Sequence, residues 1–149
     1  MPLWPKRKPR PNVDEYGRTA LWECAFKGKE QGVLQALAAG ADPNIGDDAG
    51  YTPLHIAIQE RHVSIIELLL KSGANPNSTD KHGNGPLWTA AMNARGDFTI
   101  VELLLKAGAN PNHKNNYGRS PLDVATTIGC GLEEPFRKAA ATQNTNTTS

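Results

Sequence analysis

The sequence predicts an all-α solenoid of about four helix-turn-helix repeats. Three observations lead to this prediction. One glycine-led segment recurs along the chain, a second glycine-led segment recurs in phase with it, and the residues between them show the apolar spacing of helices. Self-similarity at a fixed period of about 33 residues is the mark of a repeat architecture, in which each unit stacks on its neighbours.

The first series has glycine followed four residues later by leucine. It occurs at residues 17–21 (GRTAL), 50–54 (GYTPL), 83–87 (GNGPL) and 118–122 (GRSPL), at steps of 33, 33 and 35 residues. The second series has the pattern Gly-Ala-Asp/Asn-Pro-Asn and occurs at residues 40–44, 73–77 and 108–112. The two series keep the same phase, so the unit of repetition contains both.

Each unit is expected to hold a short helix and a longer one. Leu54, Ala57 and Ile58 share one helical face, and residues 65–70 (IIELLL) form a second, broader apolar face. The Thr-Pro and Ser-Pro pairs at residues 52–53 and 120–121 place a hydroxyl at the N-cap and proline at the first helical position. Glycines 40, 73 and 108 follow the longer helices and are suited to the left-handed conformation of a helix C-terminus.

A length of 149 residues favours one domain. We expect this domain at residues 14–141, with repeats at about 14–46, 47–79, 80–114 and 115–141. Residues 1–13 are basic and rich in proline and are expected to be a flexible segment. Residues 142–149 carry no apolar anchor and are expected to be a disordered polar tail.

Charge and composition bear on the partner. The net charge is +1, but the first 11 residues hold four basic side chains and no acid, so the remainder has 12 basic against 15 acidic residues. A near-neutral body argues against nucleic acid as the partner, although association with nucleic acid or a membrane through the basic N-terminus is an alternative.

No apolar run reaches the ~18 residues of a membrane span. Cys24 and Cys130 form no CxxC pair, and we expect a cytoplasmic protein with reduced thiols.

No arrangement of residues points to catalysis, a cofactor or a metal. The four histidines, at positions 55, 62, 82 and 113, fall on different expected elements and form no HExxH motif. Cys24 falls at the position of Ala57 in the repeat, which indicates a thiol in the core. Neither glycine series continues into the Lys-Ser/Thr of a phosphate loop. We therefore expect that the protein is not an enzyme.

Residues 52–57 (TPLHIA), together with the Gly-Ala-Asp/Asn-Pro-Asn endings, resemble the ankyrin-repeat family over about residues 14–140. The resemblance implies antiparallel helix pairs stacked in a slightly curved array, with β-hairpin-like fingers projecting roughly perpendicular to the helices. It also implies a structural role for His55, which bridges backbone groups between repeats in that family. Trp22 and Trp88 stand at the position of this histidine in two other repeats, where packing is the expected role and a binding hot spot the alternative.

The same resemblance implies that the chain binds another protein, as a monomer when free, through its finger tips and the exposed side of each first helix. All three tyrosines of the chain fall on the fingers, and tyrosine and arginine are favoured in interfaces. Carried over by position, the candidate protein-binding residues are Glu15, Tyr16, Arg18, Phe26, Lys27, Asp48, Tyr51, Gln59, Glu60, Lys81, His82, Asn84, Trp88, Met92, Asn93, Arg95, Asn116, Tyr117 and Arg119.

Repeat 3 departs from its neighbours, because residues 92–98 (MNARGDF) hold two residues more than the matching stretch of repeat 2. An insertion in a stacked array is expected on the surface, in the turn between the helices. It is either neutral variation or a contact that shapes partner choice. This insertion and residues 85–90 (GPLWTA) resemble small bacterial ankyrin proteins that serve as immunity partners of secreted toxins. A regulatory or scaffolding adaptor is the alternative.

Overall fold

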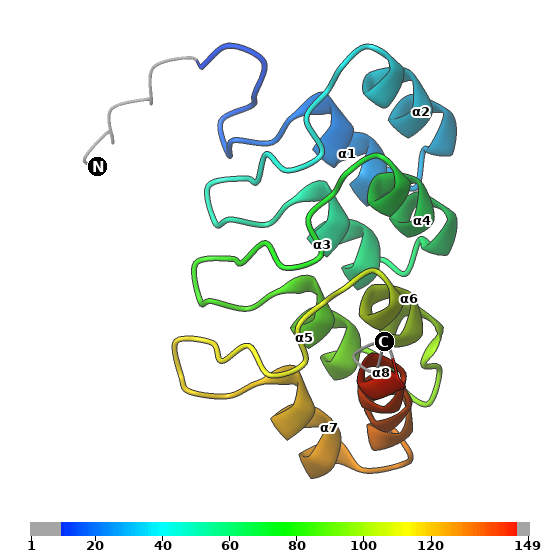
Figure 1. Ribbon diagram of the computed structural model, residues 1–149. Coiled ribbons are helices and arrows are strands. Elements are labelled where there is room, and N and C mark those ends of the chain that lie inside the picture. Colours follow the sequence, from blue (N-terminus) through cyan, green and yellow to red (C-terminus); the bar gives the residue numbers. More distant parts are fainter. Residues whose placement is uncertain (1–9, 146–149) are drawn as a thin grey trace, which may run out of the picture.

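The computed structural model describes residues 10–145, and these residues form eight helices and no β-strand. Figure 1 shows them as four helix pairs stacked one upon another. The helices are α1 (Ala20–Lys27), α2 (Glu30–Ala38), α3 (Pro53–Gln59), α4 (Val63–Lys71), α5 (Pro86–Met92), α6 (Thr99–Lys106), α7 (Pro121–Ile128) and α8 (Glu133–Thr145). The predicted all-α solenoid of four repeats is confirmed.

The molecule has three layers. The first helices of the repeats, α1, α3, α5 and α7, form an inner row, and the second helices, α2, α4, α6 and α8, lie along one side of it (Figure 1). Long loops project on the other side and are the predicted fingers. Each inner helix packs on its own partner and on the inner helix of at least one neighbouring repeat, so no repeat buries its apolar faces alone.

Short polar side chains start three of the inner helices. Thr19, Thr52 and Ser120 each accept a hydrogen bond from the backbone N–H three residues later. Thr52 and Ser120 also form the reciprocal capping box, and in both cases proline follows at the start of the helix, as predicted. In repeat 3 the N-cap is Gly85, which has no side chain to satisfy the helix N-terminus.

The longer helices end in the predicted glycines. Gly40, Gly73 and Gly108 have φ values of 91°, 92° and 96°, in the left-handed region that favours glycine. Asn77 then ties one such ending to the next, because its Nδ2 donates to the carbonyl of Gly108 at 3.1 Å and its Oδ1 accepts from the N–H of Asn110 at 2.8 Å. Asn44 makes the equivalent pair of bonds one repeat earlier.

The core is densest in repeats 2 and 3 and thinner in repeat 1. Helix α4 buries Ile65, Ile66 and Leu69, whereas α2 buries Val33 alone and leaves Leu34 exposed. Cys24 is only half-buried, although it packs against the core, so it is less enclosed than Ala57 at the same position of repeat 2. The array is therefore best packed at its centre.

The structure bears on two expectations about the chain ends. Helix α8 runs to Thr145, so residues 142–145 are helical and not part of a disordered tail. Arg10, which we placed in a flexible segment, forms an ion pair with Asp48, with Nη2 2.9 Å from Oδ1. The rest of these two expectations, on residues 1–9 and 146–149, lies outside the described residues.

Candidate protein-binding surface

Each finger is folded around one acidic or amide side chain. This residue stands three positions before the finger glycine, and its Oδ1 accepts hydrogen bonds from the backbone N–H groups two and four residues later, at 2.8–3.1 Å. Its own backbone N–H donates to the carbonyl of the fourth residue on, which closes the loop. The four residues are Asp14, Asp47, Asp80 and Asn115. Five consecutive residues are thus held in one conformation at every finger tip.

Backbone hydrogen bonds join the fingers into a row. The N–H of Asp48 donates to the carbonyl of Tyr16 at 2.9 Å, and the two following finger pairs repeat this bond at 2.9 and 3.0 Å. The fingers are so close that a Cβ on Gly50 would lie 3.0 Å from Cα of Asp80. The fingers therefore form one surface in which the spacing of the tips is fixed.

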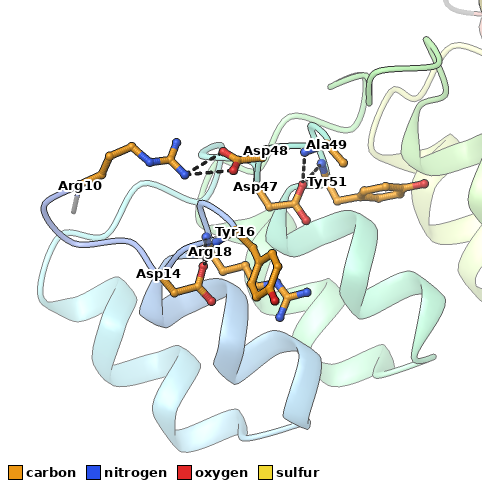
Figure 2. Close-up of polar contacts among 8 residues, drawn as sticks. All are labelled: Arg10, Asp14, Tyr16, Arg18, Asp47, Asp48, Ala49 and Tyr51. Atoms are coloured by element: carbon orange, nitrogen blue, oxygen red, sulfur yellow. Dashed lines mark hydrogen bonds and ion pairs between the residues drawn. The ribbon is translucent and has the colours of Figure 1, made fainter. Parts of the chain in front are cut away.

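The first finger carries a stack of aromatic and cationic groups. The guanidinium carbon of Arg18 lies 4.7 Å from the ring centre of Tyr16 and 4.6 Å from that of Trp22. Trp22 is itself buried and donates from its indole N–H to the carbonyl of Tyr51 at 3.0 Å. Figure 2 shows Tyr16 and Arg18 below the ion pair of Arg10 and Asp48. Arg18 is thereby fixed between two rings, with Tyr16 exposed at the tip.

The three tyrosines differ in position and exposure, although the sequence analysis treats them alike. Tyr16 and Tyr117 occupy the same position of their fingers and are 54% and 73% exposed, whereas Tyr51 occupies the position of Arg18 and is half-buried. Its ring packs edge-on against His55, with the ring centres 5.7 Å apart. Burial and the nearby Asp80 carboxylate raise the pKa of Tyr51 above its ordinary value. Tyr51 thus supports the fold as well as lining the surface.

The last finger is the most open. The ring of Tyr117 stacks on His82 of the preceding finger, with the ring centres 6.4 Å apart and an angle of 27° between the planes. Arg119 is also exposed and donates to the hydroxyl of Thr127 at 3.3 Å. The two ends of the finger row therefore each present an exposed tyrosine beside an arginine.

The C-terminal ends of the inner helices add further exposed side chains. Phe26 and Met92 are 41% and 53% exposed, and Lys27, Gln59 and Glu60 are exposed too. Asn93 and Trp88, by contrast, are half-buried, and the Asn93 amide donates to the carbonyl of Thr89 at 2.9 Å. The candidate residues Glu15, Lys81, Asn116 and Arg95 are exposed, and Asn84 is half-buried.

The predicted insertion lies on the surface, in the turn that joins α5 to α6. Arg95, Gly96 and Asp97 are exposed there. Arg61 of the preceding repeat donates to Asp97 Oδ2 and to the carbonyl of Asn93, both at 2.8 Å. Hydrogen bonds from Thr99, and then the charge of Arg61, lower the pKa of the Asp97 carboxyl. The insertion is therefore an ordered turn tied to its neighbour.

Two hollows lie away from the fingers, and the sequence analysis did not predict them. One has a volume of about 230 Å³ and lies between the turn of the insertion and the turn joining α7 to α8. The other, of about 510 Å³, lies between α6 and α8 and includes Leu105, Pro135 and Ala139 in its lining. Neither corresponds to a motif in the sequence, because both depend on how successive repeats meet.

The described part of the chain holds no group of three or more His, Cys, Asp or Glu side chains placed to bind a metal ion. Within residues 10–145, no helix has the length and apolar character needed to cross a membrane. His55 is fully buried, and its Nε2 lies 3.3 Å from the carbonyl of Asn84 in the next repeat. The structural role implied for this histidine is thus confirmed.

Stacked helix pairs with a row of fingers define a class of helical repeat protein that works as a protein-protein interaction module. The sequence profile described as ankyrin repeats in three copies matches residues 3–80 and 22–115. The chain belongs to the ankyrin-repeat family.

Individual relatives agree with this assignment over part of their length. An ankyrin repeat-containing protein of Schizosaccharomyces pombe is 37% identical over 68 residues, which are 46% of this chain and 33% of that protein. The 2-5A-dependent ribonuclease of Mus musculus is 40% identical over 75 residues, 50% of this chain and 10% of the ribonuclease. The RelA-associated inhibitor of Mus musculus is 39% identical over 71 residues, 48% of this chain and 9% of the inhibitor. The matched part is a third or less of each relative.

Proposed function

We propose that the row of fingers, together with the exposed ends of the inner helices, binds one partner protein and that the chain catalyses no reaction. The observation that carries this proposal is the set of three backbone hydrogen bonds between successive fingers, at 2.9, 2.9 and 3.0 Å. A surface whose tips are already ordered loses little conformational entropy on binding, which favours affinity.

The chemistry of the tips supports this reading. Tyr16 and Tyr117 are exposed at opposite ends of the row, and each has an arginine two residues later. Tyrosine and arginine are over-represented among the residues that contribute most to protein interfaces, since they combine apolar area with directed hydrogen bonds. Arg18 is held against two rings and by an ion pair with Glu23, in which Nη1 lies 3.8 Å from Oε1, so its guanidinium is positioned before a partner binds.

The name of one relative is consistent with a binding role. The name of the RelA-associated inhibitor describes a protein that acts through another protein. The match to the 2-5A-dependent ribonuclease covers only 10% of that enzyme, so the ribonuclease activity is no guide to this chain.

For the identity of the partner, we propose a secreted bacterial toxin that the chain binds and neutralises in the cytoplasm. The support for this narrower proposal is the likeness of residues 85–90 and of the insertion at 93–97 to small ankyrin-type immunity proteins. Co-expression with the product of the neighbouring gene tests it. Cells rescued from a toxic neighbour would support the immunity role, and cells that die despite expression of this chain would contradict it in favour of an adaptor role.

The binding surface is tested by affinity capture from the native cell with three versions of the chain. We expect the double variant Tyr16→Ala/Tyr117→Ala to bind the captured partner at least tenfold more weakly, because truncating one interface hot spot costs about 2 kcal/mol. The matched control is Glu67→Ala/Lys71→Ala on the exposed side of α4. Equal affinity for all three versions would exclude the finger row as the interface.

A further inference from the structure

The turns that join the two helices of each repeat meet one another at three successive junctions. At the first junction a side chain fills the space. The ring of His62 covers Gly28, since a Cβ on that glycine would lie 2.8 Å from the imidazole Cε1, and Nε2 lies 3.3 Å from the carbonyl of Phe26. The imidazole of His62 therefore fills the space between the turns of repeats 1 and 2.

The second junction is closed by an arginine. Arg61 reaches from the turn of repeat 2 to the turn of repeat 3, where its guanidinium donates to the carbonyl of Asn93 and to the carboxylate of Asp97, both at 2.8 Å. The two residues added to repeat 3 lie in this turn, and Asp97 is one of the residues that receive the arginine.

The third junction has no such bridge. Within residues 10–145, no hydrogen bond or ion pair joins the turn at 93–98 to the turn at 129–132. The second of these turns is Gly129-Cys130-Gly131, and its glycines have no side chain that could reach across. What remains is the hollow of about 230 Å³, which we call the repeat 3–4 hollow.

The lining of the repeat 3–4 hollow is largely apolar. Ala94 and Leu132 are buried in its wall, Phe98 is half-buried, and Met92 and Ile128 are 53% and 46% exposed. Met92 and Ile128 thus give the hollow an apolar rim that is open to solvent. An apolar cavity of about 150 Å³ is enough to hold benzene, whereas sites for drug-sized ligands are about 300–1,000 Å³. The hollow thus matches one large apolar side chain.

The hollow has a single charged residue in its lining, which is Arg95. Its φ of 47° places it in the left-handed region, and it takes part in no ion pair within the described part of the chain. The adjacent carboxylate, Asp97, is already bound by Arg61. Arg95 is therefore available to pair with a carboxylate that a ligand brings.

We infer that the repeat 3–4 hollow binds a segment of a partner protein that presents a large apolar side chain next to a carboxylate. The apolar side chain enters between Phe98 and Leu132, and the carboxylate pairs with Arg95. The inference rests on the proposed function only in that the ligand is a protein. It adds a second contact, on the turns rather than the fingers, and gives the insertion of repeat 3 a role in partner choice.

The hollow is tested by NMR titration of the full chain with three blocked peptides, acetyl-Gly-Phe-Asp-amide, acetyl-Gly-Phe-Lys-amide and acetyl-Gly-Ala-Asp-amide. We expect the first to shift the backbone amides of residues 94–98 and 129–132. The second should bind about threefold more weakly, as the loss of an exposed ion pair predicts. The third should leave those amides unchanged.

Two variants separate the parts of the inference. Arg95→Glu should reverse the preference, so that the lysine peptide binds more tightly than the aspartate peptide, while the control Arg137→Glu on α8 should keep the original order. Ala94→Leu should fill the hollow and abolish binding of both phenylalanine peptides. If Ala94→Leu fails to fold, Arg95→Glu still decides, because Arg95 lies in an exposed turn.

Three results would overturn the inference. They are equal shifts from all three peptides, no shift from any of them, and concentration-dependent shifts of the same amides without peptide, which would make a second copy of the chain the occupant. Failure here leaves the finger proposal intact if Tyr16→Ala/Tyr117→Ala still weakens capture. Peptide binding with no effect of the finger variant would refute the finger proposal alone.

Discussion

His55 links two repeats through the backbone of Asn84. Its Nε2 lies 3.3 Å from the Asn84 carbonyl, and its Nδ1 accepts from the N–H of Thr52 at 3.2 Å, so the partners assign the proton of the neutral ring to Nε2. In repeat 1 the indole of Trp22 makes the same link to the carbonyl of Tyr51 at 3.0 Å. Two different side chains thus hold a helix start to the next finger with one hydrogen bond.

This arrangement makes the stability of the protein dependent on pH. Burial lowers the pKa of His55 below its ordinary value of 6.5, although the bond to the Asn84 carbonyl acts in the opposite direction. Between the lowered pKa of the folded state and pH 6.5, the unfolded chain therefore binds a proton that the folded chain does not, and the free energy of unfolding falls as pH falls through this range. We expect this loss to approach ~1.4 kcal/mol per pH unit at most, measured by urea unfolding from pH 7.5 to 5.

His55→Gln isolates this effect. We expect the variant to be about 1–3 kcal/mol less stable at pH 7.5, because the buried hydrogen bonds are disturbed. It should also lose less stability than the wild type between pH 6.5 and 5. Parallel pH profiles for the two proteins would show that His55 is not the group responsible.

The contact between neighbouring fingers predicts that alanine destabilises the protein to different extents at two glycines of similar backbone conformation. Gly50 and Gly118 have φ values of 82° and 74°, so alanine at either position costs about 1–2 kcal/mol of backbone strain. A Cβ on Gly50 would also meet the backbone of Asp80 at 3.0 Å, whereas a Cβ on Gly118 meets nothing within 4 Å. Chemical unfolding should show Gly50→Ala to be more destabilising by at least ~1 kcal/mol.

The asparagines in the loops that follow α4 and α6, Asn77 and Asn112, offer a second matched pair of substitutions. Asn77→Ala removes two hydrogen bonds between repeats and is expected to cost about 1–2 kcal/mol. The side chain of Asn112 makes no hydrogen bond within residues 10–145, because α8 continues as helix where the next ending would lie. Asn112→Ala should change the free energy of unfolding by no more than ~0.5 kcal/mol. Similar losses for both variants would rule out the bond between repeats as the cause.

Repeat 3 can be stabilised at the start of its first helix. Gly85 has φ −91° and ψ 174°, an extended conformation that serine adopts readily, and the closest atom to an added Cβ is the Ser78 carbonyl oxygen at 3.8 Å. Gly85→Ser should supply the missing cap and restrict the unfolded chain, raising stability by ~0.5–1 kcal/mol. A melting temperature equal to or below that of the wild type would contradict this prediction.

Most of the fold could be predicted because each signal is local. Glycines that require positive φ, proline after a hydroxyl residue, and leucines on one helical face are fixed by the chain's own geometry. The residues that fold the fingers could have been found in the same way, because Asp14, Asp47, Asp80 and Asn115 recur at the same steps as the finger glycines. The extension of α8 to Thr145 was missed because its last residues are polar.

Less of the candidate surface could be predicted, because it depends on contacts between repeats. Tyr51 stands beside a finger glycine like the other tyrosines, but its position is that of Arg18, and its ring packs against His55. The repeat 3–4 hollow exists because no side chain spans a glycine-rich turn to its neighbour. Neither feature has a local signal.

Amide hydrogen exchange of the chain with and without its captured partner tests the central claim most directly. If the finger row is the interface, exchange should slow in the four finger loops and at the exposed ends of the inner helices, and should be unchanged along α2, α4 and α6. Slower exchange confined to those three helices, with the finger loops unaffected, would contradict the proposed binding surface.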